Sequence, residues 1–184
     1  MNDLIMTNYG YYITLFATFS FLGWAMECLV IKREMGYFEN RGFATGPFCT
    51  IYGFGIMILY PVMEAFGDNL LALFFLGAII ATTFEYLVGI GMTKVFGKLW
   101  WDYSHKPFNY KGILCLESTI GWGIGTIVVT KILFPYLSAS ITSLPAAYTT
   151  FIGIIFPVIY AADIGLSIYS LRKAGVDDEE FDIA

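Results

Sequence analysis

Five long apolar runs follow one another along this 184-residue chain, and most approach the roughly 20 residues that a helix needs to cross a bilayer. Hydrophobic residues make up 58% of the chain and charged residues only 14%, whereas soluble domains carry about a quarter charged residues. The sequence therefore predicts an all-α integral membrane protein. The predicted spans are Tyr9–Ile31, Phe48–Met63, Leu70–Thr93, Gly112–Phe134 and Tyr148–Leu171, and the second is the shortest.

Basic residues gather in the connections at one end of the predicted bundle, while Lys131 falls toward the other end, near Glu64 and Asp68. The positive-inside rule then places the N-terminus outside and the C-terminus in the cytoplasm of a multi-pass cell-membrane protein, as five spans also require. The basic residues that carry this prediction are Lys32, Arg33, Arg41, Lys94, Lys98, Lys106, Lys111, Arg172 and Lys173.

The first four spans read as two similar hairpins. The segment "ECL" from Glu27 corresponds to "EYL" from Glu85, and each is followed by a basic connection and a glycine-rich span. Each hairpin has two spans, so both insert with the same orientation and form a parallel repeat about an axis along the membrane normal. The predicted units are a first hairpin at 1–66, a second hairpin at 67–135, a fifth helix at 136–173 and an acidic flexible tail at 174–184.

The glycine-rich spans align under one offset. In "RGFATGPFCTIYGFG" and "KGILCLESTIGWGIG", which start at Arg41 and Lys111, this offset pairs Tyr52 with Trp122. It also pairs Gly42 with Gly112, Gly53 with Gly123 and Gly55 with Gly125. The alternative is chance similarity between two apolar segments that are both rich in glycine.

Four acidic residues lie within or at the ends of the predicted spans: Glu27, Glu85, Glu117 and Asp163. A carboxylate in a bilayer is costly, so each is a candidate functional residue. Small residues share the helix faces of the two repeat-related acids, which should turn both faces into the bundle. On the first face these are Ser20 and Gly23, and on the second they are Ala78, Ala81, Thr82 and Gly89.

The predicted site is a buried acidic and aromatic cavity in which Trp24, Tyr86 and Trp122 flank Glu27 and Glu85. Such a site suits a cation or a cationic amphipathic molecule, through ion pairing and cation–π contact. A second interpretation is that the acids form a pathway for protons. The structural alternative is that each acid caps a helix end or binds backbone groups freed by Gly and Pro.

The third connection, "KLWWDYSHKPFNYKG", combines five aromatic residues with basic ones. Aromatic residues at this position are typical of the belt at the lipid headgroups. The alternative is a docking surface for a cytoplasmic partner, formed by Trp100, Trp101, Asp102 and Tyr103.

The sequence carries no signature of catalysis or of cofactor binding. GxxxxGK[ST], HExxH and GxSxG are all absent, so the chain is not expected to be an enzyme or to hydrolyse ATP itself. Its cysteines, Cys28, Cys49 and Cys115, form no CxxC pair, and no metal or cofactor is expected. The expected surroundings are the lipid bilayer and either a second copy or a separate ATPase subunit, with no nucleic acid.

Several segments together resemble a known family. "FLGWAMEC", "RGFATGPFCTIYGFG", "FEYLVG", "WWDYS" and "FNYKGILCLESTIGWG" occur in order between about Phe19 and Gly125. They are similar to the CmpB-like family of type IV ABC-transporter permeases, which is related to the transmembrane protein 229 group. One departure is Thr50 after Cys49, where the family usually has proline. The resemblance implies a polytopic inner-membrane protein and suggests a role in transport beside a separate ATPase.

Overall fold

The structure is a computed structural model that describes residues 2–40 and 42–173. The predicted acidic tail, 174–184, lies outside the described residues. The described part is helical, with a single isolated bridge between Tyr110 and Leu114 and no strand. The elements are α1 (Asn2–Met35), α2 (Thr50–Phe66), α3 (Leu70–Phe96), α4 (Leu116–Val128), the π-helix η1 (Val129–Leu133), α5 (Phe134–Thr142) and α6 (Ala146–Lys173).

Four helical segments are long and apolar enough to cross a membrane, and they confirm the all-α membrane class. They are Asn8–Arg33, Leu70–Phe96, Leu116–Thr142 and Ala146–Leu171. The remaining predicted span, the second along the chain, corresponds to α2, which has 17 residues and is shorter than these four, as the sequence indicates.

The fourth predicted span, Gly112–Phe134, was wrong at its start. Lys111 and Gly112 have φ angles of 55° and 66°, in the left-handed region, so they cannot begin a helix. The helix instead begins at Leu116, where the Cys115 sulfur accepts from the N–H of Ser118 at 3.3 Å and the Ser118 hydroxyl accepts from the N–H of Cys115 at 3.3 Å. This reciprocal capping fixes the first turn of α4.

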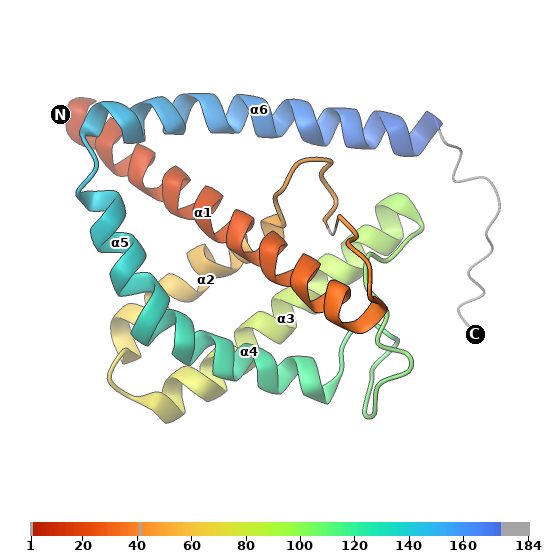
Figure 1. Cartoon of the computed structure of the whole chain (residues 1–184). Helices are drawn as coiled ribbons and strands as arrows, with labels where there is room; N and C mark the ends of the chain where they lie inside the picture. The colour runs from red at the N-terminus through yellow and green to blue at the C-terminus, as the bar shows by residue number, and fades with distance from the viewer. Residues whose placement is uncertain (1, 41, 174–184) are drawn as a thin grey trace.

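The same helical segment changes direction in its second half (Figure 1). The backbone widens into the π-turn η1, and Pro135 follows at the start of α5. Proline has no N–H and its ring clashes with the carbonyl four residues earlier, here that of Lys131, which favours a bend at this point. The helix α5 therefore leaves α4 and leads across to the start of α6.

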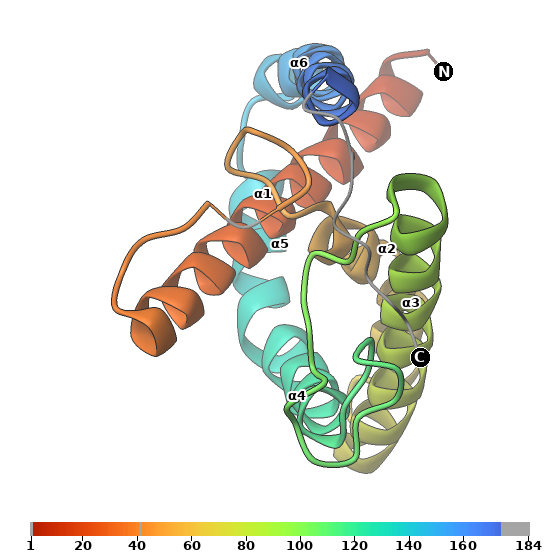
Figure 2. The same ribbon diagram turned by 90° about the vertical axis from the view of Figure 1, so that its right-hand side faces the viewer.

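The helices pack as two hairpins and an outer helix. α1 packs against α2 and α3 packs against α4, while α6 lies mainly along α1 and stands apart from the other pair (Figure 2). α1 and α6 cross closely, because a Cβ atom on Gly10 would lie 2.5 Å from the carbonyl oxygen of Thr149. Pro157 lies inside α6, which continues through it as one helix.

Two ends of the bundle differ in their connections. The loop end carries the connections 36–49 and 97–115, at the ends of α1 and α3, and α6 also finishes there. The turn end carries the short connections between α2 and α3 and between α5 and α6. A buried apolar cluster joins α1 and α2 to α5, and it contains Leu15, Phe19, Ile56, Leu59, Met63 and Ile141.

Candidate functional site

Glu85 lies inside the bundle on α3 with 3% of its surface exposed. Three side chains donate hydrogen bonds to its carboxylate. Trp122 Nε1 donates to Oε2 at 2.9 Å, Ser118 Oγ donates to Oε2 at 3.4 Å, and the Tyr103 hydroxyl donates to Oε1 at 3.3 Å. These donors replace the hydrogen bonds that water would make to the buried carboxyl group.

Glu27 lies on α1 and is half-buried. The hydroxyl of Tyr52, from α2, donates to its Oε1 at 2.5 Å. Each repeat-related acid therefore accepts a hydrogen bond from an aromatic side chain on the second helix of its own hairpin, Tyr52 in the first and Trp122 in the second.

The two acids belong to one site. The aromatic donors of the two acids, Tyr52 and Trp122, contact each other with ring centroids 5.6 Å apart. Burial raises the pKa of the Tyr103 phenol, and the charges of Glu85 and Glu27 raise it further. Tyr103 therefore stays protonated near neutral pH and remains a donor to Glu85. We call Glu27, Tyr52, Glu85, Tyr103 and Trp122 the acid pair site.

Close packing of small residues builds this site in the same way twice. A Cβ atom on Gly53 would lie 2.9 Å from the ring of Phe16, and one on Gly123 would lie 2.7 Å from the ring of Phe74. Gly23 has the same role beside Tyr52, whose ring an added Cβ atom would overlap. Because these positions have no side chain, the two helices of each hairpin approach closely enough for the acid and the aromatic donor to meet.

The connection after α3 folds back onto the site. The N–H of Tyr103 donates to the carbonyl of Gly112 at 2.8 Å, and Trp101 Nε1 donates to the carbonyl of Ile113 at 2.9 Å. Asp102 accepts from the hydroxyl and the N–H of Ser104 at 2.6 and 2.8 Å, and these hydrogen bonds lower the pKa of its carboxyl. The connection thus holds Tyr103 over Glu85 at the loop end.

The four predicted docking residues differ in their exposure and in their contacts. Trp101 and Tyr103 are half-buried and bind within the chain, while Asp102 is exposed. Trp100 packs against Phe43 and Phe96, with ring centroids 5.3 and 5.8 Å away. These residues do not form one exposed surface, and docking through them stays a prediction.

Trp24 and Tyr86 bind residues outside the acid pair site. Trp24 Nε1 donates to Oδ1 of Asn40 at 2.6 Å, and the Tyr86 ring contacts that of Tyr110 at 5.8 Å. Of the three aromatic residues predicted to flank the acids, Trp122 donates a hydrogen bond to one of them, Glu85. The neighbours of Glu27 and Glu85 along their helices are not a reliable guide to the contacts that the two acids make.

Glu117 and Asp163 lie elsewhere. Glu117 is exposed on the first turn of α4 and forms an ion pair with Lys106 at 2.9 Å. Asp163, on α6, accepts from the N–H of Gly46 at 2.9 Å. The carboxylate of Asp163 therefore fastens the connection after α1 to α6, which is the backbone-binding alternative for an acid in a membrane helix.

Sequence reasoning missed Tyr103 and Ser118 as partners of Glu85. Ser118 lies one turn before Trp122, so the helix spacing of the two residues was the available signal. Tyr103 had no such signal, because a residue in a long connection is placed by the fold of that connection.

The described residues contain no group of three or more His, Cys, Asp or Glu side chains that could hold a metal ion. Their two ion pairs join Lys106 to Glu117 and Lys131 to Asp68, so neither neutralises Glu27 or Glu85. The acid pair site is thus polar, and uncharged side chains donate its hydrogen bonds.

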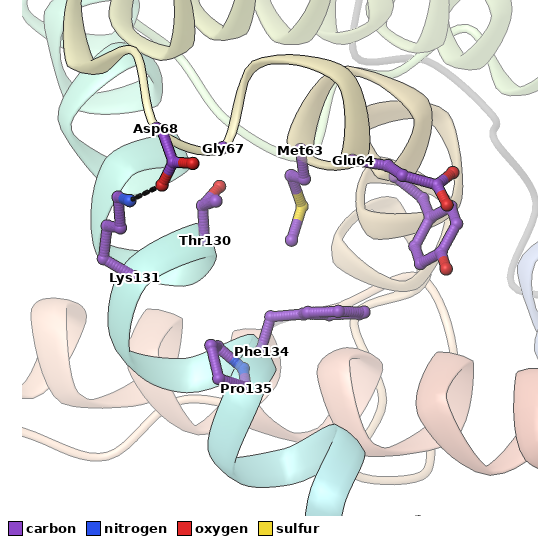
Figure 3. Close-up of a pocket in the computed structure, with 9 residues that line it drawn as sticks. Met63, Glu64, Gly67, Asp68, Thr130, Lys131, Phe134 and Pro135 are labelled. Carbon is purple, nitrogen blue, oxygen red and sulfur yellow. Dashed lines mark hydrogen bonds and ion pairs between the residues drawn. The ribbon is translucent and has the colours of Figure 1, made fainter.

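Two cavities of about 320 Å³ lie away from the acid pair site. One, at the loop end, lies between the connection after α1, the start of the connection after α3, and α6. The other, at the turn end, lies where α2 finishes beside the bend of η1 and α5, and Figure 3 shows its lining.

Comparison with known proteins identifies the family. No curated protein and no solved structure matches the chain. Residues 14–168, which include most of α1, the rest of both hairpins and most of α6, match the family described as "Putative ABC-transporter type IV". The resemblance of the sequence motifs to the CmpB-like family is confirmed, and this multi-pass membrane protein belongs to that family.

Proposed function

We propose that the chain is a transport component of the membrane and that the acid pair site binds the transported cation. One observation carries this proposal: the aromatic donors of Glu27 and Glu85, Tyr52 and Trp122, contact each other between the two hairpins of a bundle of membrane-spanning helices. Two neighbouring carboxylates with no basic partner among the described ion pairs attract positive charge. The contacting rings of Tyr52 and Trp122 add faces that favour a cation with an apolar body.

The donors around Glu85 fit this role better than a role in helix capping. Its carboxylate is bound by side chains from α4 and from the connection after α3, whereas a capping acid binds backbone N–H groups. Tyr103 and Ser118 hold it weakly, at 3.3 and 3.4 Å, so an arriving cation competes with long hydrogen bonds.

Access to the site follows from the connection after α3. Tyr103 donates to Glu85 from the connection after α3, at the loop end, and the predicted orientation places this end in the cytoplasm. A partner that moves the connection would open the site. This gives a separate ATPase a way to act, because the connection lies at the predicted cytoplasmic end.

The test uses membrane vesicles from cells that lack their own copy of the protein and carry a plasmid copy, so that any natural partner is present. Ethidium serves as the cationic probe, and its movement is followed by fluorescence. We expect Glu85→Gln and Glu27→Gln each to lower the flux at least tenfold. Glu117→Gln is the matched control, because Glu117 is exposed and lies outside the site. Equal flux in Glu85→Gln and Glu117→Gln would refute the proposed role.

A second experiment distinguishes an ATP-dependent permease subunit from an autonomous carrier or channel. Flux in the vesicles that needs ATP, together with an ATPase that co-purifies with the tagged protein in mild detergent, supports the permease subunit. Flux in liposomes that contain the purified protein alone supports an autonomous carrier or channel. If neither preparation moves ethidium, and neutral substitution of both acids changes only stability, the chain is a membrane scaffold.

A further inference from the structure

The cavity at the turn end is formed by the bend of the fourth spanning segment. It has a volume of about 320 Å³, at the lower limit of cavities that hold small organic molecules. The π-turn η1 supplies Thr130 and Lys131 to one wall, and α5 supplies Phe134 and Pro135 to the next. The end of α2 closes the opposite side, and Figure 3 shows Met63 and Phe134 facing each other across the space.

An exposed ion pair lies at one wall of this cavity. Lys131 Nζ lies 3.2 Å from Oδ1 of Asp68, which belongs to the turn between α2 and α3. The pair ties this turn to η1, on one side of the space (Figure 3). It also neutralises the one basic residue in the lining, so the remaining charge there is the carboxylate of Glu64 on the other side.

The rest of the lining is aromatic and polarisable. The rings of Tyr60 and Phe134 contact each other with centroids 5.6 Å apart, and the Tyr60 phenol interacts electrostatically with Glu64. Met63 is 6% exposed and offers a thioether, which adapts to ligands of different shape. The exposed carboxylate of Glu64 lies near the Tyr60 phenol, and a carboxylate together with aromatic rings is a combination that recognises substituted ammonium groups.

We propose that this turn-end cavity is a second binding site, which takes an organic cation that carries its charge on an apolar body. Glu64 supplies the counter-charge, Tyr60 and Phe134 form the aromatic walls, and Met63 contacts the apolar part. The site shares only the ligand class with the proposed function, and it lies at the opposite end of the bundle from Tyr103. Its ammonium ligand comes either from a free solute or from the headgroup of a membrane lipid.

The experiment uses the full chain with its natural cysteines replaced by serine and with Thr130→Cys as a reporter on the cavity wall. The thiol is modified with a cationic or an anionic methanethiosulfonate reagent, and benzyltrimethylammonium is added as the protecting ligand. We expect the cationic reagent to react at least fivefold faster than the anionic one. We expect benzyltrimethylammonium to protect the thiol, whereas its uncharged analogue neopentylbenzene protects at least tenfold less well.

Variants locate the effect. In Glu64→Gln, the cationic reagent should lose its faster reaction, and about fivefold to tenfold more benzyltrimethylammonium should be needed to protect the thiol. In Phe134→Leu, more benzyltrimethylammonium should also be needed, but the cationic reagent should still react faster than the anionic one. Glu39→Gln, at an exposed position of the loop end, changes neither. Equal protection by the charged and uncharged compounds, or unchanged protection in both Glu64→Gln and Phe134→Leu, overturns the proposal.

Two further measurements distinguish a lipid ligand from a free solute, and failure of this cavity from failure of the acid pair site. An ammonium-headed lipid that co-purifies in native mass spectrometry and is displaced by benzyltrimethylammonium identifies a lipid headgroup as the ligand. Protection without such a lipid identifies a free solute. Glu85→Gln leaves the protection of Thr130→Cys intact and lowers ethidium flux, so failure of the acid pair site and failure of this cavity give different results.

Discussion

The ring of Tyr52 contacts the ring of Trp122 at 5.6 Å, although the two residues belong to different hairpins. Each ring also carries the donor that binds the acid of its own hairpin. One offset in the sequence relates Tyr52 to Trp122, and another relates Glu27 to Glu85. The contact between the rings therefore joins the two positions that the predicted repeat aligns, and the repeat itself stays a prediction.

The first glycine of each GxG segment should be intolerant of a side chain. In Gly123→Ala the new Cβ atom would lie 2.7 Å from the Phe74 ring and 3.0 Å from its carbonyl oxygen. We expect a loss of about 1–3 kcal/mol from overpacking. Gly53→Ala should behave alike, because its Cβ atom would meet Ser20 and Phe16. Thermal unfolding in detergent measures both losses.

The second glycine of each segment is the matched control. Gly55 and Gly125 have nothing within 4 Å of an added Cβ atom. Gly55→Ala and Gly125→Ala should keep or raise stability, by about 0.5–1 kcal/mol, because alanine favours the helix. Equal losses at the first and second glycines would contradict the packing described for the hairpins.

Trp122→Phe tests the strongest hydrogen bond to Glu85. It keeps an aromatic ring beside Tyr52 and removes the indole N–H that donates at 2.9 Å. A buried carboxylate that loses a donor costs about 1–3 kcal/mol, so we expect a clear fall in the unfolding temperature. Trp24→Phe is the control, since Trp24 binds the exposed Asn40 and water replaces that contact. Equal effects of the two substitutions would show that Glu85 does not depend on its donor.

The sequence was a good guide to the helices and to the faces they bury. Apolar length located the spans, and small residues beside Glu85 predicted a buried face, which Ala78, Ala81 and Gly89 form in the structure. Both signals are local, because they depend on residues within a few turns of one helix. The class of the protein follows from them alone.

The contacts of the site were less predictable, since they depend on the path of the connections. Tyr103 reaches Glu85 because Gly112 accepts a left-handed φ and lets the connection fold back. The bend at η1, which places Lys131 beside Asp68, depends on Pro135 and on the turn after α2. No periodicity in the sequence reports such long-range placement.

Asp102→Asn tests how the connection after α3 is held, through its dependence on pH. The hydrogen bonds from Ser104 lower the pKa of Asp102 below its ordinary 3.8. A lowered pKa in the folded state stabilises the fold above the ordinary pKa, and this contribution is lost as the pH falls through the lowered value. The wild-type chain should therefore unfold at a higher temperature than Asp102→Asn at pH 7, and the difference should shrink below about pH 4.

Ser104→Ala supplies the control for that series, because it removes one donor and keeps the carboxylate. In the Ser104→Ala background the effect of Asp102→Asn should be smaller at pH 7. A difference in unfolding temperature between the wild-type chain and Asp102→Asn that stays constant from pH 7 to pH 3 would exclude a role for the ionised carboxylate.

The orientation predicted from the basic connections is testable with two single cysteines. Phe108, at the loop end, is 82% exposed, and Ser143, at the turn end, is also exposed. In a chain with its natural cysteines replaced by serine, we expect Ser143→Cys to react with a membrane-impermeant maleimide on intact spheroplasts. Phe108→Cys should react only after the membrane is permeabilised, because the positive-inside rule places its basic connection in the cytoplasm. Labelling of Phe108→Cys on intact spheroplasts would reverse the orientation, and Tyr103 would then cover Glu85 from outside.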